Sequence, residues 1–350
     1  MLFIIVGIIF FGLLVAVHEW GHYITARLLD VQVNEFAIGM GPALWSRQKG
    51  ETRYSFRLFP IGGYCAMEGE DEDTGNPRAF SAKAPWRRIV ILTAGSFMNL
   101  LAGFLLVVLL FTAVGSYSVP VLRDLAPGCP AAGYLEPGDR ILAIDGRKVS
   151  VYSDVSAALR AGGGETKDFV VRRDGQRLTL RDVPLPLREY TEDGQTLTRY
   201  GLNFTRQDAS FPGVLAEGWR TCGYFARSVW EGLSMLVRGQ VGLSDMSGPV
   251  GIVSYLGEAG HQGPTVRAGL ENVLYVIALI AVNLAIMNML PIPALDGGRI
   301  FLILCGELWF LLTRRRLDPK YEAYLHAGGF VLLLVFMLAV TFSDGWKLID

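Results

Sequence analysis

Four long apolar segments constrain the fold of this chain more than any other feature. They cover Leu2–Leu29, Ile89–Val114, Gly269–Leu290 and Ala323–Phe342. A helix that crosses a bilayer needs roughly 20 mainly apolar residues, and each segment is long enough. Hydrophobic residues make up 51% of the chain, and its mean hydropathy is +0.35. The sequence therefore predicts a multi-pass α-helical membrane protein with four transmembrane helices.

Charge and cysteine content exclude other classes. The net charge of −1 provides no bulk basic surface for nucleic acid, so we expect no nucleic-acid partner. The four cysteines are isolated and form no C-x-x-C pair, which argues against a disulfide framework or a cysteine-based zinc site.

The distribution of basic residues predicts the orientation in the membrane. No Lys or Arg precedes Arg27, whereas a cleaved signal peptide would need a basic start. The segment 30–88 is basic and contains Arg47, Lys49, Arg53, Arg57, Arg87 and Arg88. The positive-inside rule places this segment and residues 299–322 in the cytoplasm. Both termini and the long polar segment 115–267 are then expected outside.

The segment 30–88 carries strand patterns. Residues 52–58, "TRYSFRL", alternate apolar and polar side chains, and Gln48–Glu51 before them reads as a hairpin turn. The extended stretch Phe59–Met67 follows, in which Gly62 and Gly63 permit close approach of another backbone. We expect a small amphipathic sheet at the cytoplasmic membrane face; the alternative is a solvated loop.

The outer segment contains one α+β unit, over residues 117–204. Leu135–Gly146 reads L-x-P-G-D-x-I-x-x-I-x-G, with a strand at Arg140–Ile144, and a short helix ends near Leu159. A hairpin crosses Asp174-Gly175. This order resembles a PDZ domain, a class that binds extended peptides in a groove between a strand and a helix. The alternative is a spacer of the same shape that binds no peptide.

The segment 212–245 after this unit predicts an amphipathic helix on the outer membrane surface. Its apolar side chains recur at steps of three and four residues: Leu215, Trp219, Cys222, Phe225, Val229, Leu233 and Leu236.

The first apolar segment contains the polar sequence His18-Glu-Trp-Gly-His22. The H-E-x-x-H pattern on a helix places two imidazoles on one face, where they can bind one Zn²⁺, and leaves Glu19 beside the metal as a general base. Ionisable groups inside a membrane are costly, which makes a functional role the default. The alternatives are a pair of buried histidines or a proton relay in a transporter.

A catalytic zinc site needs a third protein ligand. The other two histidines, His261 and His326, are poorly placed, because the first lies outside and the second opens the fourth span. Asp296 is a better candidate. It lies in a break of the third segment, which extends to residue 298, and both Asp296 and His18 are expected near the cytoplasmic leaflet.

These motifs together resemble the site-2 protease family of intramembrane zinc metalloproteases, in particular its bacterial members, over essentially the whole chain. The resemblance rests on HEWGH in the first span, N-x-x-P-x-P-x-L-D-G-G in the third, and the PDZ-like unit between spans two and three. It implies three zinc ligands, His18, His22 and Asp296, with Glu19 as the general base. It also implies a substrate-binding set that comprises Asn288, Pro291, Pro293, Gly62, Gly63 and Tyr64.

The resemblance implies an enzyme that cuts transmembrane segments of single-span membrane proteins, such as anti-sigma factors or signal-peptide remnants. It would lie in the bacterial cytoplasmic (inner) membrane, with the bilayer as a further partner and a peptide at the PDZ-like groove. Two alternatives are a zinc-dependent transporter and a non-catalytic PDZ scaffold. Glu19 argues against the scaffold, since binding alone needs no base beside a metal.

Overall fold

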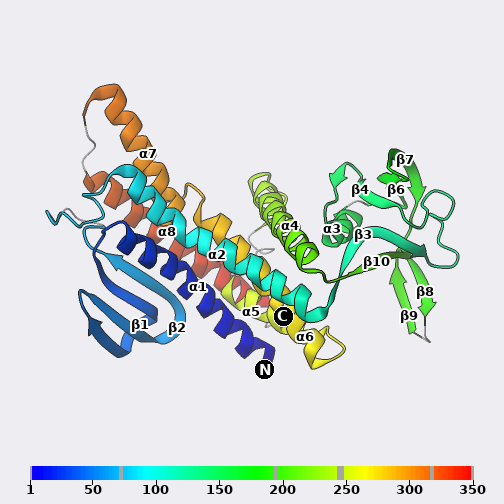
Figure 1. Ribbon diagram of the computed structural model, residues 1–350, viewed down its shortest axis with the longest axis horizontal. Coiled ribbons are helices and arrows are strands. Elements are labelled where there is room, and N and C mark those ends of the chain that lie inside the picture. The colour runs from blue at the N-terminus through cyan, green and yellow to red at the C-terminus, as the bar shows by residue number, and fades with distance from the viewer. Residues whose placement is uncertain are drawn as a thin grey trace. The chain divides into compact units, whose positions relative to one another are not determined.

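The computed structural model describes residues 2–70, 74–161, 163–192, 195–242, 248–315 and 319–347. The chain divides into two compact units, a helical unit (Met1–Val107 with Phe225–Asp350) and a strand-rich unit (Val108–Tyr224). The helices are α1 (Leu2–Leu28), α2 (Pro85–Val114), α3 (Tyr152–Ala161), α4 (Phe211–Val237), α5 (Pro249–His261), α6 (Val266–Asn288), α7 (Asp296–Thr313) and α8 (Pro319–Lys347) (Figure 1).

Four helices are long and apolar enough to cross a membrane: Leu2–Leu28, Pro85–Val114, Val266–Asn288 and Ala327–Asp344. They confirm the four predicted spans. In the helical unit α1, α5 and α6 pack around a shared core that includes Leu14, Leu256 and Ile277, and side chains of α2 complete it. This bundle fixes the polar part of α1 against its neighbours.

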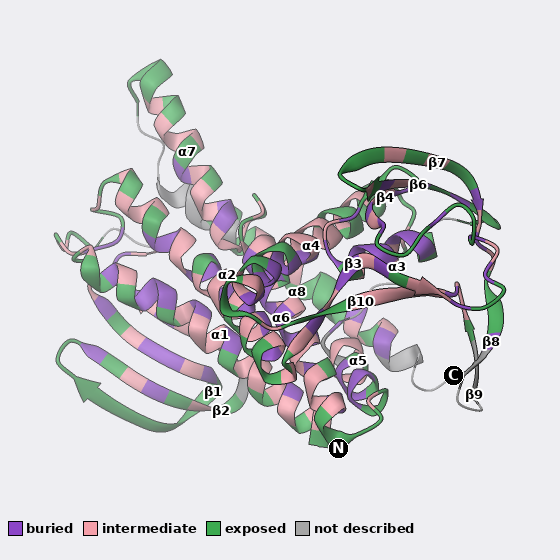
Figure 2. Cartoon of the chain, turned by 45° about the vertical axis from the view of Figure 1, so that its right-hand side comes forward, coloured by how far each residue is buried: buried purple, intermediate pink, exposed green. Residues whose placement is uncertain are grey.

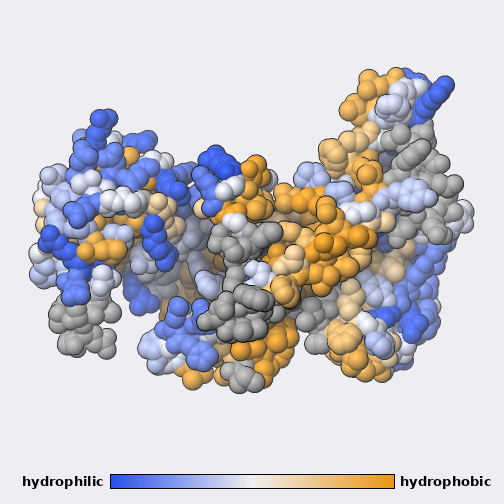
Figure 3. Space-filling view, turned by 180° about the vertical axis from the view of Figure 1, so that it is seen from behind, coloured by the Kyte–Doolittle hydropathy of each residue, from blue (hydrophilic) through white to orange (hydrophobic). Residues whose placement is uncertain are grey.

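Two helices were not predicted. The short helix α5 obtains its N-terminal cap from α8, where Asp344 Oδ2 accepts the backbone N–H groups of Gly248 (2.8 Å) and Gly251 (2.9 Å). Helix α7 occupies most of residues 299–322, for which the sequence predicts only a cytoplasmic segment. Three charged residues interrupt its apolar sequence. Apolar side chains gather on the surface of the helical unit and continue along the projecting α7 (Figure 3). Such a surface suits a bundle in contact with lipid.

The predicted sheet in the segment 30–88 is confirmed, since β1 (Val33–Lys49) pairs with β2 (Thr52–Met67). Phe36 of β1 pairs with both Tyr54 and Cys65, so the two halves of β2 flank the start of β1. The last stretch of β2, Gly63–Met67, pairs only with β1 among the described residues, and it therefore forms an edge of the sheet.

One end of this sheet is buried and the other is exposed (Figure 2). Phe36, Cys65 and Met67 pack against Tyr23 and Ala26 of α1. The opposite end presents a group of exposed apolar side chains: Met40, Leu44, Trp45, Phe56, Leu58 and Phe59. The packed end holds the edge strand against α1, beside the H-E-x-x-H motif.

The strand-rich unit contains a six-stranded sheet in the order β10-β3-β4-β6-β7, with β5 beside β4. Its strands are β3 (Ser116–Leu125), β4 (Arg140–Ile144), β5 (Arg147–Lys148), β6 (Thr166–Arg173), β7 (Gln176–Pro184) and β10 (Leu202–Asp208); β8 (Arg188–Glu192) and β9 (Gln195–Arg199) form a separate hairpin. The predicted strand, the helix α3 and the hairpin at Asp174-Gly175 are all confirmed. Both turn residues have positive φ, as a type I′ turn requires.

The amphipathic helix predicted in the segment 212–245 is confirmed as α4, Phe211–Val237. It is shorter than the predicted segment, whose last residues, 243–245, lie outside the described residues.

Candidate metal centre

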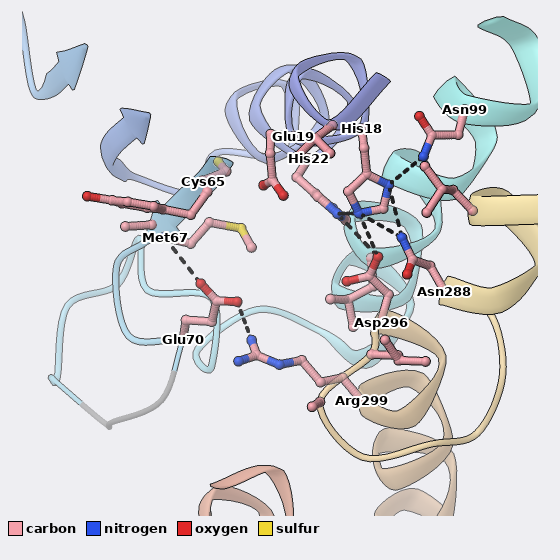
Figure 4. A pocket seen from close by; sticks show the side chains of 17 residues that line it. His18, Glu19, His22, Cys65, Met67, Glu70, Asn99, Asn288, Asp296 and Arg299 are labelled. Carbon is pink, nitrogen blue, oxygen red and sulfur yellow. Dashed lines mark hydrogen bonds and ion pairs between the residues drawn. The ribbon is translucent and has the colours of Figure 1, made fainter. Parts of the chain in front are cut away.

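Three side chains far apart in the sequence converge on one point. His18 Nε2 and His22 Nε2 lie 3.2 Å apart, and each lies 3.3 Å from Asp296 Oδ2 (Figure 4). The two imidazole rings meet edge to face, with centroids 4.7 Å apart. Both histidines are buried, at 8% and 5% exposure. The structure thus brings together the three residues that the sequence predicted as metal ligands.

The spacing of these atoms suits zinc. Ligand atoms about 2.0–2.2 Å from a tetrahedral ion lie roughly 3.3–3.6 Å from one another. The three observed separations of 3.2, 3.3 and 3.3 Å are close to this range. Two imidazole nitrogens and one carboxylate oxygen are also a donor set that zinc accepts in catalytic sites. Asp296 Oδ2 is buried without a hydrogen-bond partner among the described residues, which leaves it available to an ion.

Helix α1 brings the two histidines to one face because they are four residues apart. Helix α2 packs against that face closely enough to require glycine on both sides. A Cβ atom on Gly21 would lie 2.5 Å from the Ala94 carbonyl oxygen. A Cβ atom on Gly95 would lie 2.4 Å from His22 Nε2 and 2.7 Å from His18 Cε1. The site therefore depends on the absence of side chains at this helix contact.

Two groups of α2 contact the outer nitrogens of the histidines. The Ile91 carbonyl lies 2.9 Å from His22 Nδ1. The side chain of Asn99 lies with its Nδ2 3.4 Å from His18 Nδ1. Neither group was predicted from the sequence, although Ile91, Gly95 and Asn99 recur at steps of four in an otherwise apolar helix. That spacing is the signal that could have found them.

A tight reversal of the chain delivers Asp296. Helix α6 ends at Asn288, and α7 starts at Asp296 after a turn in which Ala294 has a φ of +79°. A Cβ atom on Gly297 would lie 2.3 Å from the Met289 carbonyl oxygen, so the turn folds back against the start of α7. This geometry explains why the sequence has glycine after the aspartate.

A cavity of about 520 Å³ opens beside the three ligands. Glu19 and Asn288 line it, together with Tyr64, Cys65 and Met67 of the edge strand. The carboxylate of Glu19 interacts with the backbone amide of Cys65. A general base, a candidate metal centre and an open strand edge therefore share one space.

The predicted substrate-binding residues divide into two groups. Asn288 is at the site, with Nδ2 3.4 Å from His18 Nε2, and Gly63 and Tyr64 belong to the edge strand beside Glu19. Gly62 has a φ of +89° in the bend that leads into this strand.

Pro291 and Pro293 lie in the turn between α6 and α7 and do not line the cavity. Of the rejected histidines, His261 contacts Phe3 and the Gly257 carbonyl, while the His326 side chain lies outside the described residues.

An ion pair that the sequence did not predict borders the cavity. Arg299, one turn after Asp296 on α7, pairs with Glu70, which follows the edge strand (Figure 4). Glu70 Oε2 also accepts the backbone N–H of Met67 at 3.3 Å. The pair therefore connects the helix that carries Asp296 to the edge strand.

The fold and site define a membrane-embedded metalloprotease, and sequence comparison identifies its family. Residues 6–336 match the family model of Peptidase family M50, and the chain therefore belongs to this family. A protein of Clostridium acetobutylicum named as a zinc metalloprotease is 34% identical, covering 97% of this chain and 96% of that protein. One from Fusobacterium nucleatum, named likewise, is 31% identical and covers 99% of both chains. The Bacillus subtilis protein named regulator of sigma-W protease RasP is 27% identical, with 97% of both chains covered.

The chain is thus a zinc metalloprotease of the membrane, which confirms the predicted activity and cofactor. Membership in a peptidase family decides against the transporter and the scaffold.

Proposed function

We propose that His18, His22 and Asp296 bind the zinc ion and that Glu19 is the general base. The convergence of the three ligand atoms at 3.2–3.3 Å carries this proposal. Purified protein should contain about one zinc per chain, and in detergent it should cleave single-span membrane peptides. Zinc-loaded protein that cleaves no such peptide would contradict the proposal.

The residues around the cavity divide the chemistry among them. Zinc, when bound, supplies Lewis acidity that polarises a scissile carbonyl and acidifies a water molecule. Glu19 accepts a proton from the attacking water and returns it to the nitrogen that leaves as the C–N bond breaks. The Asn288 amide is the donor best placed to stabilise the negative charge that develops on the carbonyl oxygen.

The strand edge Gly63–Met67 is proposed to hold the substrate. A transmembrane helix hides its peptide bonds in its own hydrogen bonds, and unwound backbone in lipid costs several kcal/mol per unpaired group. Pairing with a strand edge satisfies those groups again. Because the Cys65 amide faces Glu19 rather than β1, Cys65 has the outward N–H.

The pair Cys65→Pro and Cys65→Ala tests this role. Proline removes the N–H, whereas alanine keeps it and removes the same thiol. The proline variant should cleave more slowly with zinc retained, and the alanine variant should stay near the native rate. Equal rates for the two variants would show that this N–H does not hold the substrate.

The substrates proposed are single-span membrane proteins with helix-weakening residues near the cut, including anti-sigma factors and signal-peptide remnants. The name of the Bacillus subtilis relative, regulator of sigma-W protease RasP, supports the first class. We place the enzyme in the bacterial cytoplasmic (inner) membrane, with residues 30–88 and 299–322 in the cytoplasm and both termini and the PDZ-like unit, residues 117–204, outside. Helix α5 is not assigned to the outside, because it packs with Leu14 of α1 and Ile277 of α6, near the middle of two spans. The distribution of Lys and Arg supports this topology, and labelling of single engineered cysteines from either side tests it.

The strand-rich unit is proposed to be a PDZ domain that excludes substrates with bulky outer domains. Its strand order and the helix α3 support this assignment. The full-length enzyme should therefore cleave a trimmed single-span substrate faster than the same substrate fused to a folded outer domain. Equal rates would contradict the proposed exclusion by size. They would not bear on the proposed zinc ligands or on Glu19.

A further inference from the structure

Helix α2 contacts the Nδ1 atoms of both histidines of the candidate metal centre. Ile91, Gly95 and Asn99 form a stripe at steps of four residues, and this stripe faces His18 and His22. Ile91 supplies a backbone carbonyl to one histidine, and Asn99 supplies a side-chain amide to the other.

The orientation of the rings determines what these outer partners must do. Both Nε2 atoms point towards Asp296, at 3.3 Å each. A neutral imidazole can offer the Nε2 lone pair to a metal only when its proton is on Nδ1. A buried Nδ1–H group needs an acceptor. For His22 that acceptor is the Ile91 carbonyl at 2.9 Å.

Asn99 is the corresponding partner of His18. Its side chain is 1% exposed, and its Oδ1 has no hydrogen-bond partner in the part of the chain that the structure describes. The amide nitrogen and oxygen have nearly the same shape, so a half-turn of the amide presents Oδ1 to the Nδ1–H. The Asn288 amide is less suitable, because its Nδ2 is almost equally far from both ring nitrogens, at 3.5 and 3.4 Å. It therefore does not lie along the Nδ1–H direction.

We propose that Asn99 is a positioning residue that accepts the His18 Nδ1–H, fixes the tautomer of that ring and so sets the affinity for zinc. Outer partners of this kind hold the ring in the metal-binding orientation and make the ligand more basic. The proposal rests on the proposed role of His18 as a zinc ligand.

Two substitutions at this position separate the acceptor role from simple packing. Asn99→Leu keeps the branched shape and the number of side-chain heavy atoms and removes the acceptor, and it should weaken zinc binding by about 10–100-fold. Asn99→Asp keeps an acceptor that cannot donate, and it should bind zinc at least as tightly as the native chain. The new carboxylate would lie on the Nδ1 side of the ring, away from Nε2, and so could not replace a ligand.

The measurement is zinc affinity of the purified full-length protein in detergent, by competition with a chelator of known affinity. The visible spectrum of the cobalt-substituted protein is the second measurement, and it should be native in Asn99→Asp and altered in Asn99→Leu. Thr93→Val is a matched control on the same helix, because its hydroxyl donates to the Ile89 carbonyl one turn away and contacts neither histidine among the described residues. It should leave both zinc affinity and spectrum unchanged.

Two outcomes would overturn the proposal: native zinc affinity in Asn99→Leu, or equal losses in Asn99→Leu and Asn99→Asp. The helical circular dichroism of the metal-free proteins monitors folding. If Asn99→Leu does not fold, Asn99→Asp alone tests the proposal, which is wrong if this variant binds zinc more weakly than the native chain or has an altered cobalt spectrum. His18→Ala distinguishes this failure from failure of the proposed function. If His18→Ala keeps native zinc affinity, the ligand assignment is wrong, whatever the result at Asn99.

Discussion

Asp139 of the strand-rich unit and Asp296 of the helical unit both lie in buried surroundings, but they differ in their hydrogen-bond partners. Asp139 is fully buried, and its oxygens accept bonds from Arg173 Nε (2.8 Å), Arg173 Nη2 (2.7 Å) and the Glu136 amide (3.0 Å). Asp296 Oδ2 instead faces two histidine nitrogens at 3.3 Å and has no hydrogen-bond partner among the described residues. A carboxylate with all its bonds made holds a fold together, whereas one that converges with other ligand atoms is arranged for an ion.

The largest expected effect comes from making Asp296 neutral. Asp296→Asn keeps the shape but removes the negative charge, and we expect zinc affinity to fall by more than the roughly 100-fold typical of losing an outer partner. Cleavage should fall with it. Metal analysis and a peptide-cleavage assay measure both, with Asp139→Asn as the control that should keep its zinc. If Asp296→Asn retained zinc and activity, Asp296 would not be a metal ligand, and the proposed difference between the two aspartates would be wrong.

The second prediction separates the chemistry from the binding of the metal. Glu19→Gln has nearly the same size but cannot accept a proton, so cleavage should fall by about 10²–10⁴-fold. Zinc content should stay at the native level because Glu19 is not among the three converging ligands. Single-turnover cleavage together with metal analysis tests this, and native turnover would be incompatible with a general-base role.

The third prediction concerns the aspartate that holds the fold. Asp139→Asn leaves the Arg173 guanidinium without its buried carboxylate, and it should destabilise the strand-rich unit by about 3 kcal/mol, near the lower end for breaking a buried ion pair. Thermal unfolding of the full-length protein measures this loss. Unchanged stability would show that the saturated carboxylate contributes little to the fold.

The smallest effect is expected at Glu35 on β1, whose partners resemble those of Asp139. Burial alone would raise the pKa of Glu35, but hydrogen bonds from Ser55 (2.6 Å) and Arg57 (2.8 Å) hold this pKa below its ordinary value of 4.5. The charged form therefore stabilises the folded state above pH 4.5, and this contribution is lost as the pH falls through the lower folded-state pKa.

Glu35→Gln should reduce stability by roughly 1–2 kcal/mol at pH 7. The difference from the native chain should shrink below pH 4.5. Thermal midpoints of both proteins at a series of pH values measure it. A difference that does not change with pH would contradict the assigned role of the charge.

Much of the metal centre was predictable because its signals are local. Two histidines four residues apart must share a face of a helix, and the prolines and glycines around Asp296 mark a break in an apolar segment. The strand alternation in "TRYSFRL" likewise predicts β2. In the strand-rich unit, Asp174-Gly175 predicts the hairpin between β6 and β7.

The remaining features depend on distant partners. The identity of the edge strand follows from Phe36 pairing with both Tyr54 and Cys65, which no local pattern encodes. The ion pair of Glu70 with Arg299 joins residues 229 positions apart. Asn99 is a single amide in an apolar helix, and its role cannot be predicted until its contact with His18 of α1 is known.

The contact between Glu70 and the Met67 amide has a consequence for the energetics of substrate binding. If a substrate strand pairs at Met67, it must displace an acceptor that the enzyme already supplies. Binding is then an exchange of hydrogen bonds, in which their number changes little. The net affinity must come from the side chains buried on pairing and from the weakness of the bonds given up by the substrate helix. An intact helix gains little from this exchange, and discrimination against stable helices follows without a separate recognition element.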